Sequence, residues 1–194
     1  MKTTISPEPA LLGFLRSGPV HGYELYKRVT EELAPVWHLG LSQMYAILNE
    51  YAARGWIQTR VEAQGLRPSK KILELTPAGR EAFDSWMAQP ARGLREFRVD
   101  FFARLYFARA LGSAKMGHLI DRQIAECRRE LKKLEAGRQG QQNPENEFRQ
   151  AVRQFRVEQL WAALHWLENN RPRLSPSRIT RPANPLSTRR AVEK

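Results

Sequence analysis

The apolar positions of the first fifty-four residues are spaced for three short helices. The first is predicted to begin at Ser6-Pro7, where a capping hydroxyl precedes a proline, and to stop at Gly18-Pro19. The second is expected to run from near His21-Gly22 to Pro35. The third is expected to be capped by Ser42 and to end at Arg54, because Gly55 supplies the left-handed residue that commonly terminates a helix.

The spacing of the apolar residues then changes from the helical period to the alternation of a β-strand. Residues 56–61 and 71–75 predict two paired strands joined by a polar loop. Thr76-Pro77 predicts a fourth, freshly capped helix that continues to about Met87. Helices, a hairpin and a further helix in this order are the layout of a winged helix-turn-helix, which presents one helix to the major groove of DNA. We therefore expect a mainly α fold with a winged helix-turn-helix DNA-binding domain over residues 1–88.

The second half of the chain carries the apolar spacing of helices that need a partner. Helices are predicted over 94–112, 113–137 and 145–170. The second has apolar residues at steps of four and three, which form a heptad seam, and the apolar side of the third is too wide for one neighbouring helix. We therefore expect residues 89–170 to form a helical dimerisation and effector domain covered by a second subunit. The expected dimer contacts are Leu105, Ile120, Ile124, Leu131, Leu134, Phe155, Leu160 and Leu164.

The distribution of charge qualifies the DNA-binding prediction. The net charge of +12 suggests a polyanionic partner. However, residues 1–88 carry 10 Lys and Arg against 9 Asp and Glu, whereas residues 171–194 carry 7 against 1. The latter stretch also has four prolines and few apolar residues, so we expect a disordered basic tail over 171–194. The DNA-binding prediction therefore depends on local pattern more than on overall basicity.

Short polar groups and cations mark the surface expected to touch DNA. Ser42 and Gln43 lie at the N-terminal turn of the third helix, where bulk would keep backbone and bases apart. Cations at a hairpin tip suit phosphate contact, which positions a protein without reading sequence. Taken singly, these features also fit a capped surface helix and a hairpin made basic for solubility. The expected contacts from this pattern are Lys27, Ser42, Gln43, Met44, Asn49, Arg67, Lys70 and Lys71.

Four motifs in a fixed order resemble those of the PadR family of bacterial transcriptional regulators. They are Gly18-Pro19-Val20-His21-Gly22-Tyr23-Glu24-Leu25, Leu41-Ser42-Gln43-Met44-Tyr45, Arg54-Gly55-Trp56-Ile57 and Leu75-Thr76-Pro77-Ala78-Gly79-Arg80. The resemblance covers residues 10–88. It implies a homodimeric repressor or regulator whose C-terminal helices dimerise and often sense a small molecule. It also implies that Tyr23 and Tyr45 contact the DNA backbone or brace the domain.

The chain departs from the family pattern at two places. Gln43-Met44 stands where family members commonly have glycine and a small residue, and Ile72-Leu73 replaces an aromatic residue in the wing. The first departure bears on base preference and the second on the packing of the wing.

The remaining chemistry-bearing residues predict no cofactor, no metal site and no catalytic residue. The four histidines do not fall at metal-ligand spacings with one another or with Cys127, whose place on the heptad seam favours packing over redox sensing. Trp161 and His165 are the candidate effector contacts, and a packed core histidine is the alternative. The single cysteine and the lack of an apolar run of roughly 18 to 20 residues predict a cytoplasmic protein with no membrane partner.

These observations predict a transcriptional regulator that is not an enzyme. We expect a homodimeric repressor that binds an inverted-repeat operator in double-stranded DNA and is released by a small molecule, with an aromatic one as candidate. A winged-helix adaptor that binds protein without sequence-specific DNA binding stays open as the alternative, because the first domain is nearly neutral.

Overall fold

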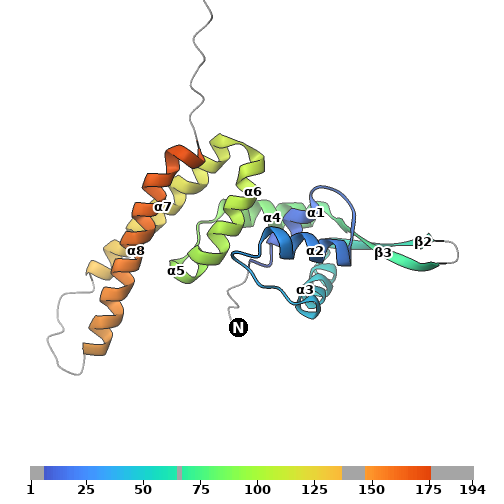
Figure 1. The fold of residues 1–194 in the computed structure, drawn as a ribbon, viewed down its shortest axis with the longest axis horizontal. Helices are drawn as coiled ribbons and strands as arrows, with labels where there is room; N and C mark the ends of the chain where they lie inside the picture. The colour runs from blue at the N-terminus through green and yellow to red at the C-terminus, as the bar shows by residue number, and fades with distance from the viewer. Residues whose placement is uncertain (1–6, 65–66, 137–146, 176–194) are drawn as a thin grey trace, which may run out of the picture.

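Helices make up most of the chain, and one small antiparallel sheet forms the wing. The computed structural model describes residues 7–64, 67–136 and 147–175, with the side chains of 63–70 excepted. The elements are α1 (Ala10–Leu15), β1 (Val20–His21), α2 (Gly22–Glu32), α3 (Leu41–Ala53), β2 (Ile57–Gln64), β3 (Arg67–Leu75), α4 (Pro77–Ala88), α5 (Gly93–Glu96), the π-helix η1 (Phe97–Phe101), α6 (Phe102–Leu111), α7 (Ser113–Ala136) and α8 (Glu147–Leu174). The hairpin projects at one end of the molecule and the α7–α8 pair lies at the other (Figure 1). The predicted fold class, mainly α with a winged helix, is confirmed.

The glycine that ends α3 leads the chain directly into the wing. Gly55 has φ +69°, its N–H donates to the Ala52 carbonyl, and the Trp56 N–H donates to the Tyr51 carbonyl over 2.9 Å. These two bonds form a Schellman motif, and the rings of Tyr51 and Trp56 supply its apolar contact at 5.2 Å. The predicted left-handed stop at Gly55 is confirmed.

Thr76 caps α4 and ties that helix to the end of α3. Its Oγ1 accepts a hydrogen bond from the Gly79 N–H over 3.1 Å and lies 2.7 Å from the Gly55 carbonyl oxygen. Pro77 occupies the first turn, as predicted. The helix therefore begins where the sequence indicated, and Phe83 and Trp86 on its inner side are buried.

Other helix boundaries differ from the predicted ones. The α3 helix begins at Leu41 with Gly40 in the cap position, so Ser42 lies inside the helix and caps nothing. The α2 helix ends at Glu32, before Pro35. The α1 helix begins only at Ala10, because residues 7–9 form a tighter turn in which the Ala10 N–H donates to the Pro7 carbonyl. The predicted cap Ser6 lies outside the described residues.

The sheet has a third strand that the sequence did not indicate. Its order is β1-β3-β2, and the two residues of β1 pair antiparallel with Ile72 and Leu73. The strand β3 is therefore central, and both of these residues are buried. The β2 and β3 strands also extend well beyond the predicted 56–61 and 71–75, and the residues expected to form a loop prolong the hairpin.

Two apolar clusters hold the molecule together, and α6 contributes to both. The first lies among α1–α4 and the sheet, and it includes Ala103 and Phe107 of α6. The second lies among α5–α8, and it includes Ala108 of the same helix. A single helix therefore packs against the winged helix on one side and against the α7–α8 pair on the other.

A buried polar group joins the end of α4 to the π-helix. Trp86 Nε1 donates to Asp100 Oδ1 over 3.0 Å, and Arg104 Nε donates to the Trp86 carbonyl over 3.0 Å. The Arg104 guanidinium also lies 4.8 Å from the centre of the Trp86 ring. Burial raises the pKa of the Asp100 carboxyl and lowers that of Arg104, so the ion pair forms at a desolvation cost.

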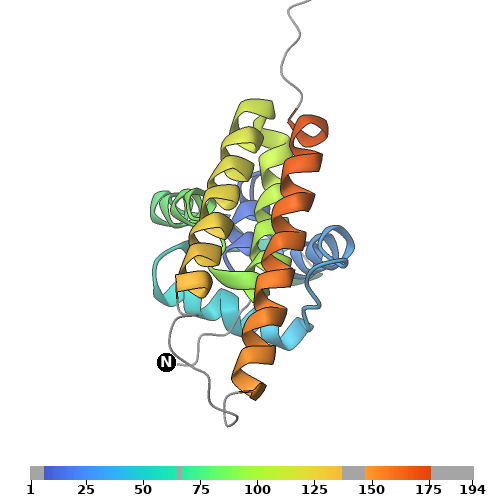
Figure 2. The same ribbon diagram turned by 90° about the vertical axis from the view of Figure 1, so that its left-hand side faces the viewer.

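The α7 and α8 helices pack against each other over most of their length (Figures 1 and 2). The heptad residues Ile120, Ile124, Cys127 and Leu131 are buried between these helices and the preceding ones, in agreement with the predicted seam. Burial raises the pKa of the Cys127 thiol, which keeps it in the neutral form suited to packing.

The end of α8 lies further along the chain than predicted. The helix was expected to stop at residue 170, with a disordered tail from 171, but it continues to Leu174. Arg171 forms two hydrogen bonds with the Asp121 carboxylate on α7, and Ser175 Oγ donates to the Ser113 carbonyl over 2.6 Å. These contacts with α7 extend the helix, and the rest of the predicted tail lies outside the described residues.

Candidate nucleic-acid interface

The buried side of α3 fixes which of its residues face outward. Met44, Ile47, Leu48 and Tyr51 are all buried, at the spacing of one helical face. Met44, predicted to contact DNA, is fully buried in the first cluster, so that prediction is wrong. Its neighbour Tyr45 is instead 42% exposed.

The side chains left on the outer face of α3 are mostly polar and short. Ser42, Gln43, Tyr45 and Asn49 are all exposed, and the first two stand in the first turn of the helix. Exposed, short polar groups are what contact with the base edges of a major groove requires, and the contact itself stays a prediction.

Tyr45 also determines how closely α2 approaches α3. A Cβ atom on Gly22 would lie 2.7 Å from the Tyr45 hydroxyl oxygen, so a larger residue at the start of α2 would require the Tyr45 ring to shift. The pairing of β1 with β3 holds the chain just before this point. Gly22 therefore makes a close contact between the start of α2 and the Tyr45 side chain of α3.

A cleft of about 610 Å³ joins α2, α3 and the wing. Four predicted contacts line it: Tyr23, Tyr45, Asn49 and Lys71. Tyr23 is 68% exposed, and Lys71 is exposed on β3. The structure thus brings together residues that stand almost fifty positions apart in the sequence.

The cleft also contains residues that the sequence analysis did not assign to the site. Among them are His21 and Thr59, and His21 Nδ1 lies 3.4 Å from the carbonyl oxygen of Lys71. The unpredicted β1–β3 pairing places His21 there, since only the sheet register brings it opposite Ile72. The sequence motif that contains His21 carries no signal for this contact.

The remaining predicted DNA contacts lie apart from this cleft or cannot be placed. Lys27 is exposed on α2, where its ammonium lies 3.8 Å from the Glu31 carboxylate. Arg67 and Lys70 belong to β3, but their side chains lie outside the described residues.

The predicted dimer contacts divide into two groups. Five of them are buried in the second cluster of the single chain and do not face outward: Ile120, Ile124, Leu131, Leu160 and Leu164. Leu105 and Leu134 are half-buried against the same cluster, so their contact with a partner stays a prediction. Phe155 is instead 59% exposed on α8. The reason is that α7 and α8 cover each other's seam within one chain.

The candidate effector contacts do not line any of the described clefts. Trp161 is 53% exposed on α8, and His165 is exposed beside Asn169, with 2.8 Å between the two side-chain nitrogens. His165 is therefore not a packed core histidine, and its role as an effector contact stays a prediction.

The described ranges also bear on metal binding and on membrane insertion. In these ranges His, Cys, Asp and Glu side chains form no group of three or more that could hold a metal ion. None of the described helices combines the length and apolar character needed to cross a membrane.

Comparison with known proteins identifies the winged helix. Residues 11–85 match the model of the transcriptional regulator PadR-like family, and this segment contains most of α1, all of α2, α3 and the sheet, and most of α4. The negative transcriptional regulator PadR of Bacillus subtilis is 28% identical over 126 residues, which cover 65% of this chain and 69% of that protein. The winged helix of this chain is thus similar to that of the PadR-like family of transcriptional regulators.

Solved structures also show similarity to this chain. Bacillus subtilis PadR in complex with operator DNA is 24% identical, with a TM-score of 0.43, over 86% of this chain and 98% of that chain. The protein smu.1604c from Streptococcus mutans is 22% identical, with a TM-score of 0.43, over 85% of this chain and 98% of that chain.

Proposed function

We propose that this PadR-like regulator is a homodimeric repressor that reads an inverted-repeat operator with α3 and contacts the flanking phosphates with its wing. The observation that carries this proposal is the outer face of α3, where Ser42, Gln43 and Asn49 are exposed beside a cleft lined by Lys71. The Bacillus subtilis relative is named a negative regulator, which supports repression as the sign of the response.

The exposed apolar residues of α8 support a dimer. Phe148, Val152 and Phe155 are spaced by four and three positions, and they are 79%, 41% and 59% exposed. Residues at this spacing share one face of a helix, and an exposed stripe of this kind is typical of a helix that pairs with a partner. We propose that the same stripe of a second copy covers it, so that two winged helices read two half-sites about one DNA turn apart, roughly 34 Å.

We also propose how the chain is divided. Residues 1–88 would form the DNA-binding unit and the following helices the dimerisation unit, with α6 in contact with both clusters. A ligand that acts between these units would change the spacing of the two winged helices. Selecting bound sequences from a random duplex pool tests the proposed function as a whole: enrichment of an inverted repeat supports it, and no enrichment favours a protein-binding adaptor.

Replacing Gln43 by alanine should change which sequences are bound. Its side chain is exposed in the first turn of α3, and an amide can pair with a base edge, where the wrong base costs about 1–3 kcal/mol. We expect Q43A to relax preference at one position of each half-site in a gel-shift series. The control Q89A removes an exposed amide at the end of α4, away from the cleft. Unchanged affinity and preference in Q43A would remove Gln43 from the reading surface.

Replacing Lys71 should act on all sequences alike. Its exposed ammonium on β3 is suited to a phosphate, and each phosphate contact contributes about 0.9 to the slope of log K against log salt. A dimer has two such lysines, so K71Q should flatten that slope by about 2 without changing sequence preference. The matched control is K132Q on α7. An equal slope in K71Q and wild type would contradict the phosphate role.

A further inference from the structure

His21 places an imidazole in the cleft between α2, α3 and the wing. It stands in the N-cap position of α2, yet its side chain makes no capping hydrogen bond. The ring reaches the neighbouring strand instead, where Nδ1 lies 3.4 Å from the Lys71 carbonyl oxygen. The sheet holds this arrangement, because β1 pairs with β3 at His21 and Ile72. The side chain is therefore not used to start the helix.

The Lys71 carbonyl determines which nitrogen of the His21 ring carries the proton. A carbonyl oxygen only accepts hydrogen bonds, so the nitrogen that faces it, Nδ1, is the one that donates. A neutral imidazole has a single N–H, and its Nε2 is then an acceptor. Nε2 has no hydrogen-bond partner among the residues that the structure describes. The neutral ring therefore has only an acceptor left to offer to a ligand in the cleft.

A DNA phosphate oxygen is also an acceptor, so it cannot form a hydrogen bond with this neutral ring. A proton taken up from solvent at Nε2 makes the ring a cation that donates from both nitrogens. One bond then goes to the Lys71 carbonyl and the other to the phosphate, and such charge-assisted bonds are roughly twice as strong as neutral ones. Contact between His21 and the DNA backbone therefore requires a proton.

The charges that surround His21 leave room for one more cation. Among the residues that line the cleft, Glu24 of α2 and Lys71 of β3 are charged, and these two charges cancel. The α2 and α3 helices also contribute the phenols of Tyr23 and Tyr45. On β2, Arg60 shares a row of the sheet with Ile72 and His21, but it lies 3.7 Å from the Glu74 carboxylate. Protonated His21 therefore gives the cleft a net positive charge, which suits a phosphate.

We propose that His21 contacts a phosphate of the bound DNA in its protonated form, so that each chain takes up a proton when DNA binds. This inference rests on the DNA-binding function proposed above, and it adds a dependence on pH. Because the complex holds more protons than the free protein, the affinity for DNA falls as the pH rises. With two copies of His21 in a dimer, the slope of log K against pH approaches about −2.

Calorimetry on the full-length protein and a selected duplex counts the protons. The titration is repeated near neutral pH in two buffers with different heats of ionisation, and the difference in heat gives the number of protons taken up. We expect at least half a proton per chain for the wild type. H21Q retains a side-chain N–H donor but cannot titrate, so its uptake should be close to zero. An uptake close to zero in the wild type would overturn the proposal.

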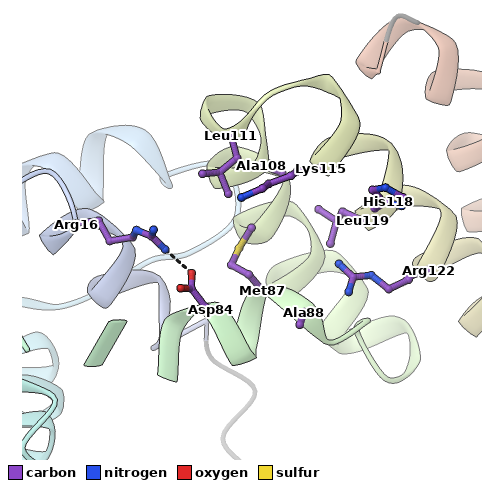
Figure 3. A pocket seen from close by; sticks show the side chains of 10 residues that line it. All are labelled: Arg16, Asp84, Met87, Ala88, Ala108, Leu111, Lys115, His118, Leu119 and Arg122. Atoms are coloured by element: carbon purple, nitrogen blue, oxygen red, sulfur yellow. Dashed lines mark hydrogen bonds and ion pairs between the residues drawn. The ribbon is translucent and has the colours of Figure 1, made fainter. Parts of the chain in front are cut away.

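Two control variants test whether His21 is the group that titrates. His118 is an exposed histidine of α7 that lines a different cleft, between α1, α4, α6 and α7 (Figure 3). H118Q removes the same chemical group from outside the DNA-binding cleft and should keep the wild-type uptake. E24Q removes the carboxylate that shares the cleft with His21 and should keep it as well. A loss of uptake in either control, with none in H21Q, would overturn the assignment.

The variant H21R separates a phosphate contact from a purely structural role. Gel shifts at constant salt concentration, between about pH 6 and pH 8.5, should show the wild-type affinity falling at least tenfold, because an imidazole loses its charge in this range. H21R carries a permanent cation, so its affinity should change less than threefold over the same range. Equal losses of affinity in H21Q and H21R at every pH would indicate a structural role and contradict the proposal.

The outcomes distinguish this inference from the proposed function. If the protein enriches an inverted repeat and binds it without proton uptake, His21 makes no such contact, while the proposed function stands. If the protein binds no duplex, both fail. Thermal melting shows whether H21Q and H21R are folded, and if they are not, the proton count of the wild type and the two controls decides the proposal.

Discussion

Replacing Phe148 and Phe155 by arginine should dissociate the dimer and lower the affinity for the operator at least a hundredfold. Both side chains are largely exposed, so the change should leave the single chain folded. In the dimer, however, it would bury four new cations at one interface, beside Arg149 and Arg156 of each chain. The loss of DNA affinity follows because a monomer engages one half-site only, and linking two sites commonly raises affinity by about 10² to 10⁴.

The matched control is W161R. Trp161 is also a large, exposed aromatic residue of α8, but at 100° per residue it lies on a different face from Phe148 and Phe155. Sedimentation velocity should show monomers for F148R/F155R and dimers for W161R, with gel shifts reporting affinity for the two-half-site duplex. Added positive charge alone would favour DNA, so a reduced affinity points to lost dimerisation. A dimeric F148R/F155R protein would rule out this face as the interface.

Local signals were sufficient for the parts of the fold that are made by local contacts. The end of α3 at Gly55 and the start of α4 after Thr76 depend on the chain within a few residues, through backbone and hydroxyl hydrogen bonds. These positions could therefore be predicted from the sequence. The two-residue strand β1 could not be, because it is too short to show alternation and exists only through its pairing with β3.

The two faces of α3 show a second limit of prediction from sequence. Met44, Ile47, Leu48 and Tyr51 form the buried face of the helix. The neighbouring Tyr45 is also largely apolar, so the sequence alone does not decide whether Met44 or Tyr45 is buried. Its ring covers Gly22 while much of its surface stays exposed, as an amphipathic side chain allows. Only the close approach of α2 decides between the two residues, and that approach is a tertiary contact.

The heptad seam of α7 shows that a pattern can require a partner without saying which one. Its residues were predicted to face a second subunit, but they pack against α8 and the preceding helices of the same chain. The wide apolar side of α8 is in fact two faces: Leu160 and Leu164 turn inward, and Phe148 and Phe155 turn outward. The period of the apolar residues indicates that a helix face is packed against another element. The connection between the helices determines how much of that packing lies within one chain.

The buried ion pair at the end of α4 makes the second prediction with a large expected effect. Replacing Asp100 by alanine leaves Arg104 buried without its carboxylate and Trp86 Nε1 without its acceptor. Already one nitrogen of Arg104, Nη1, has no hydrogen-bond partner in the described structure. Breaking a buried pair from one side commonly costs about 3–5 kcal/mol, so D100A should lower the free energy of unfolding by about 3 kcal/mol.

The double variant D100A/R104M separates the cost of the unpaired charge from the loss of packing. It removes both charges and keeps an apolar side chain over Trp86, so we expect it to regain at least half of the stability lost in D100A. Urea unfolding measures the stability of D100A and of the double variant. The protein concentration is kept the same, because dimerisation makes stability depend on concentration. If the double variant is as unstable as D100A, the carboxylate contributes through packing alone. If it recovers, the stability lost in D100A comes from the unpaired charge of Arg104, buried where α4 meets the π-helix.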